Sequence, residues 1–374
     1  MKSRSLSVVP LLLGLAATAP GRSAPAVDLP TRPDERLQGV YRSNRVWNGV
    51  TTTRDGRVFV CYPGADGPGV GAEEILPDGA KKPYPDQQWN SWKPGGDISH
   101  GFVCVNALRV GPDGRLYIVD AGSPGSNQPA VPGAGRILQV DLATNQVTRV
   151  YPLAKAARPK SYIDDLRFNG DKAYITDVGE PGLIVLDLPT GEARRVLDGD
   201  PATSARRPMY ADGKVMREKD GKERVSHADQ LEVSPDGKYL YFLPCPGPTA
   251  RVETRFLNDA TLPPKLLASH VEAWLETPTC GGTAIDAEGN LYYSDTNGQR
   301  ILKITPDRQV STVVADPRLQ WSDAMWIDQE GFLWLPVSQQ NFTPGFTGGK
   351  QEVRYPVEIY KLQIGAKPAA NDHP

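Results

Sequence analysis

Six positions of the sequence carry groups that could act together chemically, because each begins one copy of an internal repeat. Three are carboxylates, two are amides and one is a glycine. If the fold brings them together, such an oxygen-rich ring suits a hard cation such as calcium. Without a cation, neighbouring carboxylates raise one another's pKa, which suits proton transfer. We call these positions the lead residues: Asn48, Asn106, Asp164, Asp229, Gly281 and Asp323.

Catalytic and ligand-binding candidates follow from this ring. The catalytic candidates are Asp164, Asp229 and His227. An imidazole changes its charge near neutral pH, so His227 or Asp229 could move a proton. The ligand-binding candidates at this place are Asn48, Asn106 and Asp323. The alternative is structural: Asp and Asn before a strand often cap turns, and His227, like His100 upstream of Asn106, can lie in a surface loop.

Each lead residue opens a β-hairpin. Alternating apolar positions follow it, then a turn with glycine, then a second apolar strand. In five of the six copies the glycine stands eight positions after the lead residue. Glycine there supplies the positive φ that a tight hairpin turn needs. The second strands cover residues 58–60, 116–119, 173–175, 239–243, 291–293 and 332–335.

Further strands complete the repeat. Third strands are expected at 136–140, 183–186, 300–304 and 357–362, and fourth strands at 147–150, 193–197 and 310–314. Six repeats of four short strands predict an all-β fold, a six-bladed β-propeller. The last repeat lacks an outer strand, and residues 37–41 lack a partner, so we expect the N-terminal strand to close the last blade. The alternative is a sandwich of unrelated hairpins.

Composition supports one globular unit. The 374 residues include 37 Gly and 35 Pro along the whole chain, which excludes long helices as the main architecture. With 39% apolar residues and seven Trp, the chain has enough material for a core. No apolar run reaches the roughly 20 residues of a membrane span. We expect a single propeller domain over residues 27–374.

Residues 1–26 have the pattern of a secretory signal peptide. Lys2 and Arg4 precede a leucine-rich stretch, and Ala24-Pro25-Ala26 supplies a small-x-small cleavage site. We therefore expect a secreted or periplasmic protein; the alternative is a buried N-terminal helix. Removal of the leader changes the net charge from −2 to −5. An acidic product has no basic surface for nucleic acid.

The four cysteines fit an oxidising compartment. Cys61 ends a second strand and Cys104 stands just before the next lead residue, and Cys245 and Cys280 occupy similar places. Adjacent blades would bring these places together. Of the three possible connectivities we expect the disulfides Cys61–Cys104 and Cys245–Cys280, each of which would tether a long insertion.

Two aromatic segments could stack a flat ligand over the ring or plug the channel. They are residues 89–92, with two tryptophans, and residues 340–346, with two phenylalanines.

Several motifs resemble the major royal jelly/Yellow protein family. The most characteristic is Tyr174-Ile-Thr-Asp-Val-Gly-Glu-Pro-Gly-Leu-Ile-Val-Leu-Asp-Leu-Pro-Thr-Gly191. Residues 48–60, 229–237 and 321–334 carry others, and the resemblance spans about residues 36–364. It implies a secreted six-bladed propeller. Some family members are similar to dopachrome-converting enzymes and others bind biogenic amines through an Asn and an aromatic residue; Asn341 and Phe342 match that place loosely.

A more distant resemblance is to gluconolactonase/senescence marker propellers, which are metal-dependent lactone hydrolases. Their cation is held by a Glu, an Asn and an Asp, where this sequence has Asn48, Asp229 and Gly281 or Gly282. Two of the three ligand types are therefore missing. A different site for calcium or zinc is expected at Asp164, Asp229 and Asp323, where the cation would lower the pKa of bound water.

Three functions follow. The first is a propeller that binds a small polar or aromatic metabolite at the channel mouth and isomerises it, with Asn48 and Asn106 orienting the ligand. The second is a metal-assisted lactonase, and the third is a scaffold whose loops contact a partner.

Overall fold

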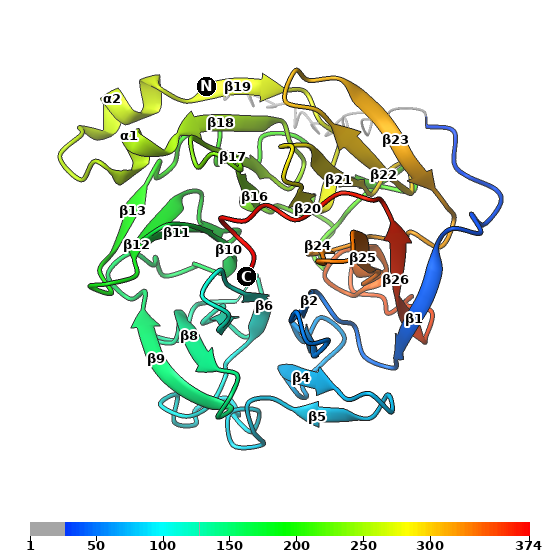
Figure 1. Ribbon diagram of the computed structural model, residues 1–374, viewed down its shortest axis with the longest axis horizontal. Helices are drawn as coiled ribbons and strands as arrows, with labels where there is room; N and C mark the ends of the chain where they lie inside the picture. Colours follow the sequence, from blue (N-terminus) through cyan, green and yellow to red (C-terminus); the bar gives the residue numbers. More distant parts are fainter. Residues whose placement is uncertain (1–26, 127) are drawn as a thin grey trace, which may run out of the picture.

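Hairpin repeats arrange six four-stranded sheets around one axis. The structure is a computed structural model that describes residues 27–126 and 128–374, so the expected leader lies outside the described residues. Within the described part, each sheet forms one blade of a propeller (Figure 1). The predicted all-β, six-bladed fold is confirmed.

The first three blades follow one another along the chain. Blade 1 contains β2 (Val50–Thr52), β3 (Val58–Cys61), β4 (Ala72–Ile75) and β5 (Lys81–Pro83). Blade 2 contains β6 (Val105–Val110), β7 (Leu116–Asp120), β8 (Arg136–Asp141) and β9 (Gln146–Pro152). Blade 3 contains β10 (Ile163–Asn169), β11 (Lys172–Asp177), β12 (Leu183–Asp187) and β13 (Ala193–Val196).

The fourth blade carries the helices. It contains β16 (Ala228–Val233), β17 (Tyr239–Pro244), β18 (Thr249–Glu253) and β19 (Glu272–Leu275). Helices α1 (Thr254–Asn258) and α2 (Pro264–Ser269) lie between its last two strands, and the hairpin β14 (Tyr210–Ala211) and β15 (Lys214–Val215) precedes the blade. None of the described helices has the length and apolar character that crossing a bilayer requires.

The last two blades complete the ring. Blade 5 contains β20 (Cys280–Ile285), β21 (Leu291–Asp295), β22 (Arg300–Ile304) and β23 (Val310–Ala315). Blade 6 contains β24 (Trp326–Ile327), β25 (Phe332–Pro336) and β26 (Val357–Gln363), with the short 3-10 helix η1 (Gln340–Phe342) between the last two.

The N-terminal strand β1 (Gln38–Ser43) supplies the outer strand of blade 6, as predicted. It pairs antiparallel with β26, from Gln38 opposite Lys361 to Ser43 opposite Val357. The sheet order is therefore β1-β26-β25-β24, and the two ends of the ring meet within one blade (Figure 1).

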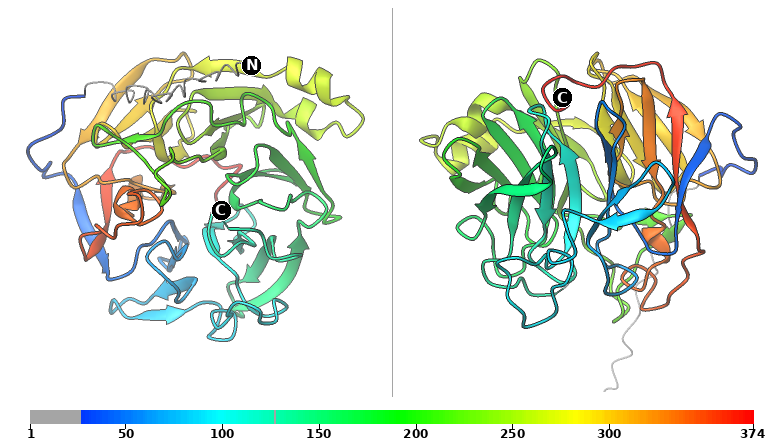
Figure 2. Two further views of the ribbon diagram at one scale, coloured as in Figure 1. Left: turned by 180° about the vertical axis from the view of Figure 1, so that it is seen from behind. Right: turned by 60° about the horizontal axis from the view of Figure 1, so that its bottom comes forward.

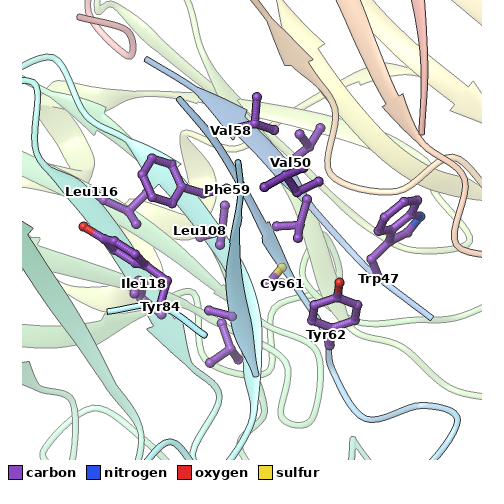
Figure 3. Packing of buried hydrophobic residues seen from close by; sticks show 14 of the residues in the cluster. Trp47, Val50, Val58, Phe59, Cys61, Tyr62, Tyr84, Leu108, Leu116 and Ile118 are labelled. Atoms are coloured by element: carbon purple, nitrogen blue, oxygen red, sulfur yellow. The ribbon is translucent and has the colours of Figure 1, made fainter. Parts of the chain in front are cut away.

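The core lies between the blades. The inner strand β6 is buried along its whole length, whereas in the outer strand β9 only Tyr151 is buried and the other residues are exposed or partly buried. Figure 3 shows the packing of blade 1 against blade 2, where Phe59 of β3 lies near Leu108 and Ile118. Phe59 also contacts the Tyr84 ring edge-on at a centroid distance of 4.7 Å. Apolar contact between neighbouring blades therefore holds the ring together.

Ion pairs fill the middle of the channel. The Arg167 guanidinium on β10 is fully buried and makes two hydrogen bonds to Glu232 on β16, at 2.9 and 2.8 Å. It also donates to Asp165 at 2.6 Å. Arg109 of β6 lies 3.6 Å from the same Asp165 carboxylate, and Thr283 of β20 donates to Glu232 at 2.8 Å. This network, the axial ion cluster, joins blades 2 to 5.

The four cysteines correct one prediction. All are buried free thiols, so the disulfides Cys61–Cys104 and Cys245–Cys280 are not formed in the described residues. Three of the thiols donate to backbone carbonyls of Asn106, Cys280 and Gly282 at 3.2 to 3.3 Å. Cys104 lies 3.3 Å from the Pro63 carbonyl and 3.2 Å from the Tyr162 hydroxyl. Burial raises the pKa of each thiol and keeps it protonated as a donor.

Loss of Arg167 should destabilise the fold strongly. Arg167→Ala leaves Glu232 and Asp165 buried without their main cation, which costs about 3 to 5 kcal/mol of unfolding free energy. Arg158→Ala is the matched control, because Arg158 and Asp198 form a pair whose side chains are 48% and 46% exposed. That control should lose little stability, because water screens an exposed ion pair. Urea unfolding of the two variants measures the difference, and an equally small loss in both would contradict the role of the cluster.

Candidate functional site

The six lead residues line one cavity at one end of the channel. Its volume is about 270 Å³, and we call it the mouth cavity. Each lead residue stands at or just before the start of an innermost strand, so the ring geometry brings the six starts together. Figure 2 shows the loops of this end on the face of the ring opposite the C-terminus.

Hydrogen bonds link the lead residues of the first three blades. The Asn48 Nδ2 donates to the Asn106 carbonyl at 3.0 Å. The Asn106 Nδ2 in turn donates to Asp164 Oδ1 at 2.5 Å, and the Asn106 Oδ1 accepts from the Tyr162 hydroxyl at 2.9 Å. Each amide is therefore held by the neighbouring blade, and its orientation is fixed.

The chain of contacts continues through blades 3 to 5. The Thr176 hydroxyl donates to the Asp229 carbonyl at 2.7 Å and lies 3.4 Å from Asp164 Oδ2. The Gln230 Nε2 donates to Asp229 Oδ1 at 2.5 Å and to the Gly281 carbonyl at 3.2 Å. Bonds between blades therefore set the positions of the carboxylates.

Glycine at the fifth lead position is required by a close approach of two blades. A Cβ on Gly281 would lie 2.4 Å from the Ser322 carbonyl oxygen, and one on Gly282 would lie 2.1 Å from that of Asp323. Blade 6 thus passes too close for a side chain, and this part of the cavity wall is backbone.

Three carboxyl groups in the cavity are destabilised as anions. Burial raises the pKa of Asp164 and Asp323 well above the ordinary value, and Asp229 is the next largest cause for both. Burial also raises the pKa of Asp229 to about 7, although hydrogen bonds from Gln230 and Cys245 oppose the shift. Asp164 and Asp323 are buried, whereas Asp229 is partly exposed to the cavity. Asp229 is therefore the carboxyl that changes charge near neutral pH and that a ligand can reach.

The described residues do not gather into a calcium or zinc site of the expected kind. Protein donors already engage the three carboxylates: Asn106 binds Asp164, Gln230 binds Asp229, and the Trp321 indole donates to Asp323 at 3.1 Å. Within residues 27–126 and 128–374, no group of three or more His, Cys, Asp or Glu side chains is arranged to hold a metal ion. The metal role predicted for Asp164, Asp229 and Asp323 therefore finds no support in the geometry.

Aromatic residues missed by the sequence analysis also line the cavity. Tyr162 and Trp321 each stand two positions before a lead residue, and this shared place in two of the six repeats is the only local signal that the sequence offers for them. Trp321 contacts the Phe346 ring edge-on at 5.2 Å. Phe346 belongs to the 340–346 segment, which contributes Gln340, Thr343, Gly345 and Phe346 to the lining of the mouth cavity.

Arg224 is the single guanidinium among the residues that line the mouth cavity, counting only the described part of the chain. It donates to the Ser126 hydroxyl at 2.5 Å, pairs with Glu218 at 3.3 Å and lies 4.9 Å from the Phe346 ring centre. Its Nε has no hydrogen-bond partner among the described residues. Arg224 comes from the long insertion before blade 4, and no local pattern in the sequence marks it.

Neither the catalytic candidate His227 nor His100 lines this cavity. The His227 Nδ1 accepts a hydrogen bond from the Ala205 amide at 3.1 Å, and burial lowers the pKa of His227. His100 is exposed, and its ring lies 5.7 Å from Trp89. Trp89 packs against Phe102 instead of facing the mouth cavity.

Asn341 and Phe342 lie in a separate cavity of about 220 Å³. There the Asn341 Nδ2 is 3.5 Å from Asp212 Oδ2. Phe346 lines both cavities and separates them. The structure therefore does not bring Asn341 and Phe342 together with the lead residues.

Comparison with known proteins gives one family and one fold. The family described as major royal jelly protein matches residues 103–359, more than half of the chain. No curated protein matches the chain.

Solved structures of the same fold include a gluconolactonase from Xanthomonas campestris, with a TM-score of 0.55, 15% identity and coverage of 92% of this chain and 97% of that one. A luciferin-regenerating enzyme has a TM-score of 0.54, 12% identity and coverage of 90% and 98%. A virginiamycin B lyase from Staphylococcus aureus has a TM-score of 0.51, 14% identity and coverage of 88% and 99%. At these identities the likeness shows the fold alone.

Asp229 should make stability depend on pH. Its pKa is about 7 in the folded chain and near the ordinary 3.8 in the unfolded chain, so the folded state binds more protons between these values. The free energy of unfolding should therefore fall as the pH rises from 4 to 7, by at most about 4 kcal/mol for this group.

The amide in Asp229→Asn cannot ionise, so this variant should lose less stability over that range. Urea unfolding at several pH values measures the difference, and identical pH profiles for the two proteins would refute the assignment.

Proposed function

This chain belongs to the major royal jelly protein family, and from that premise we propose that it binds a small polar molecule with a cationic group in the mouth cavity. The observation that carries the proposal is the charge of the cavity. Three carboxyl groups and one guanidinium line about 270 Å³, and the guanidinium already pairs with Glu218.

A bound cation would supply the positive charge that these carboxyl groups need in order to ionise. Their pKa values are raised because burial and mutual repulsion oppose ionisation. An ammonium group beside Asp229 would favour the anion and gain charge-assisted hydrogen bonds. Binding at neutral pH should therefore release a proton from the cavity.

The rest of the cavity suits a flat or aromatic body. Trp321 and Phe346 form an apolar wall, and such rings pack favourably against another ring. The amides of Asn48 and Asn106 also line the cavity and could orient polar groups of the ligand.

Benzylamine and benzyl alcohol form a matched pair of probes for this proposal. Benzylamine should bind about tenfold more tightly or better, because a hydrogen bond to a charged group is worth roughly 1.5 to 3 kcal/mol. Asp229→Asn should remove most of this difference, and Asp307→Asn, at an exposed turn, should not. Calorimetric titration in buffers of different protonation enthalpy measures both the affinity and the released proton.

Equal affinity for the two probes would refute the cationic preference. If neither probe nor any other small molecule bound, the scaffold function would be the remaining candidate. For the lactonase alternative we name no metal ligands, because no group of three or more His, Cys, Asp or Glu side chains in the described residues is arranged to hold a cation.

A second function, transfer of a proton to or from carbon in the bound ligand, is favoured by the pKa of Asp229. A general base works best when its pKa lies near the working pH, and that of Asp229 is about 7. Asp229 would take a proton from a carbon next to a carbonyl and return it to another atom of the same molecule, which isomerises it without a further reactant.

Deuterium exchange tests this second function. In D2O the protein should speed exchange at the acidic CH2 groups of 2-indanone, and the rate should rise as the pH passes 7, because the base form of Asp229 then accumulates. Asp229→Asn should lose at least about 100-fold of the rate, as expected for loss of a general base. Nuclear magnetic resonance follows the exchange, and an unchanged rate in the variant would exclude Asp229 as the base.

A further inference from the structure

Residues 367–374 cross the channel at the end opposite the mouth cavity. In Figure 1 this segment runs over the ring and ends at its centre, and Figure 2 shows it on one face of the disc. The residues of blades 3 and 4 that this segment contacts come later in the inner strands than the lead residues do. Phe168 is four positions after Asp164, and Ser234 is five positions after Asp229. At about 3.3 Å per residue, these contacts lie roughly 13 to 17 Å from the mouth.

The segment is anchored to several blades. The Ala287 amide of blade 5 donates to the Lys367 carbonyl at 2.8 Å, and Pro368 bridges to Asp286 beside it. In blade 4 the Ser234 carbonyl accepts a hydrogen bond from Asn371 Nδ2 at 3.0 Å.

Its last residues reach blades 1 and 6. The His373 ring lies 4.0 Å from the Trp326 ring of blade 6. The Pro374 carbonyl accepts hydrogen bonds from Arg54 of blade 1 at 3.0 Å and from Gln329 of blade 6 at 2.9 Å.

Asp372 connects the segment to the axial ion cluster. One carboxylate oxygen accepts from the Phe168 amide at 3.1 Å, and the other accepts from Arg109 at 3.3 Å and lies 3.8 Å from Arg167 Nε. The Asp372 side chain is 1% exposed. It therefore joins blades 2 and 3 from outside the ring of strands.

Docking of the segment leaves polar groups unsatisfied. Both ring nitrogens of His373 and the Asn371 Oδ1 are buried without a hydrogen-bond partner in the described residues. Such groups lose their hydrogen bonds to water and gain none in return. These unsatisfied groups lower the stability of the docked segment, so we expect it to open more readily than the hydrogen-bonded strands of the blades.

We propose that residues 367–374 form a strap that seals this end of the channel, is latched by Asp372, and opens as a unit while the ring stays folded. The mouth is then the way into the channel for a ligand. The strap does not depend on the proposed function, because none of its residues lines the mouth cavity.

Two groups of the strap respond to pH in opposite directions. The groups that face them are Arg109 on β6, Asp165 and Arg167 on β10, and Glu232 on β16. Burial raises the pKa of Asp372 to about 6, and burial with the two arginines lowers the pKa of His373 well below 6.5. In the open strap both would return to their ordinary values of 3.8 and 6.5. Between pH 3.8 and about 6 the docked strap binds one proton on Asp372, and the open strap binds one proton on His373. Because both states bind the same number of protons, the free energy of docking changes little with pH in this range.

Hydrogen exchange of the full chain, followed by mass spectrometry, tests the strap. The amides of Phe168 and Ala287 donate to Asp372 and Lys367, so they report docking. In Asp372→Ala both amides should exchange at least about tenfold faster, while the strands of the blades keep their protection. Asp220→Ala, at a side chain that is 53% exposed, is the matched control and should change neither amide.

The pH response separates a latch from a general loss of stability. With exchange expressed relative to an unstructured chain at the same pH, docking in Asp372→Ala should weaken as the pH falls below 6.5, because only His373 then gains a proton on opening. In His373→Ala docking should strengthen as the pH falls from 6 towards 3.8, because Asp372 holds its proton only when docked.

Unchanged exchange at Phe168 and Ala287 in Asp372→Ala would overturn the proposal, and so would equal acceleration throughout the ring. If Asp372→Ala does not fold, the variant Asn371→Ala tests the proposal in its place, because it removes only the hydrogen bond from Asn371 to Ser234. Faster exchange at Ala287 with an intact ring would then support the strap, and unchanged exchange would overturn it.

Discussion

Neutralisation of polar groups on the central axis is the constraint on which this structure depends. Six inner strands converge there, and the charged side chains that they carry can reach little water. Halfway along the channel, the Arg167 guanidinium meets Glu232 and Asp165, and four blades are tied together by a balanced cluster. At the mouth the carboxyl groups outnumber the cations. The same convergence thus produces a rigid centre and an unbalanced end, and the unbalanced end is where binding of a ligand gains most.

The two ends of the channel are closed in different ways. The mouth is bordered by long insertions, which bring Arg224 and Phe346 over the lead residues. The other end is crossed by a short segment that adds one more carboxylate, Asp372, to the axial ion cluster. Family membership accounts for the six-bladed ring. It does not account for the chemistry, because one fold is shared by proteins with different activities. The chemistry depends on the side chains at the mouth, and these come partly from insertions outside the repeated strands.

The blades could be predicted from the sequence because their signals are local. Glycine eight positions after a lead residue marks a hairpin turn, and five of these glycines have φ between 70° and 88°. The pairing of the N-terminal strand with blade 6 could be predicted because the last repeat lacks an outer strand and residues 37–41 lack a partner in their own repeat. Contacts made by insertions and loops left no such signal, so Arg224 was missed and His227 was placed in the cavity. Proximity of two cysteines also does not fix where a sulfur points: the Cys61 thiol faces the Asn106 carbonyl, and no disulfide forms.

Pairing of β1 with β26 has a consequence for the order of folding. Almost the whole chain lies between Gln38 and its partner Lys361, whereas the hairpins of the other blades join neighbouring segments. Long-range pairing requires loop closure before it gains contacts, so blade 6 should be completed last. Until β26 has been synthesised, β1 and β25 both present unpaired edges, which attract other chains. Synthesis of β26 therefore converts an open, association-prone arc into a closed ring in which β1 and β25 are both paired.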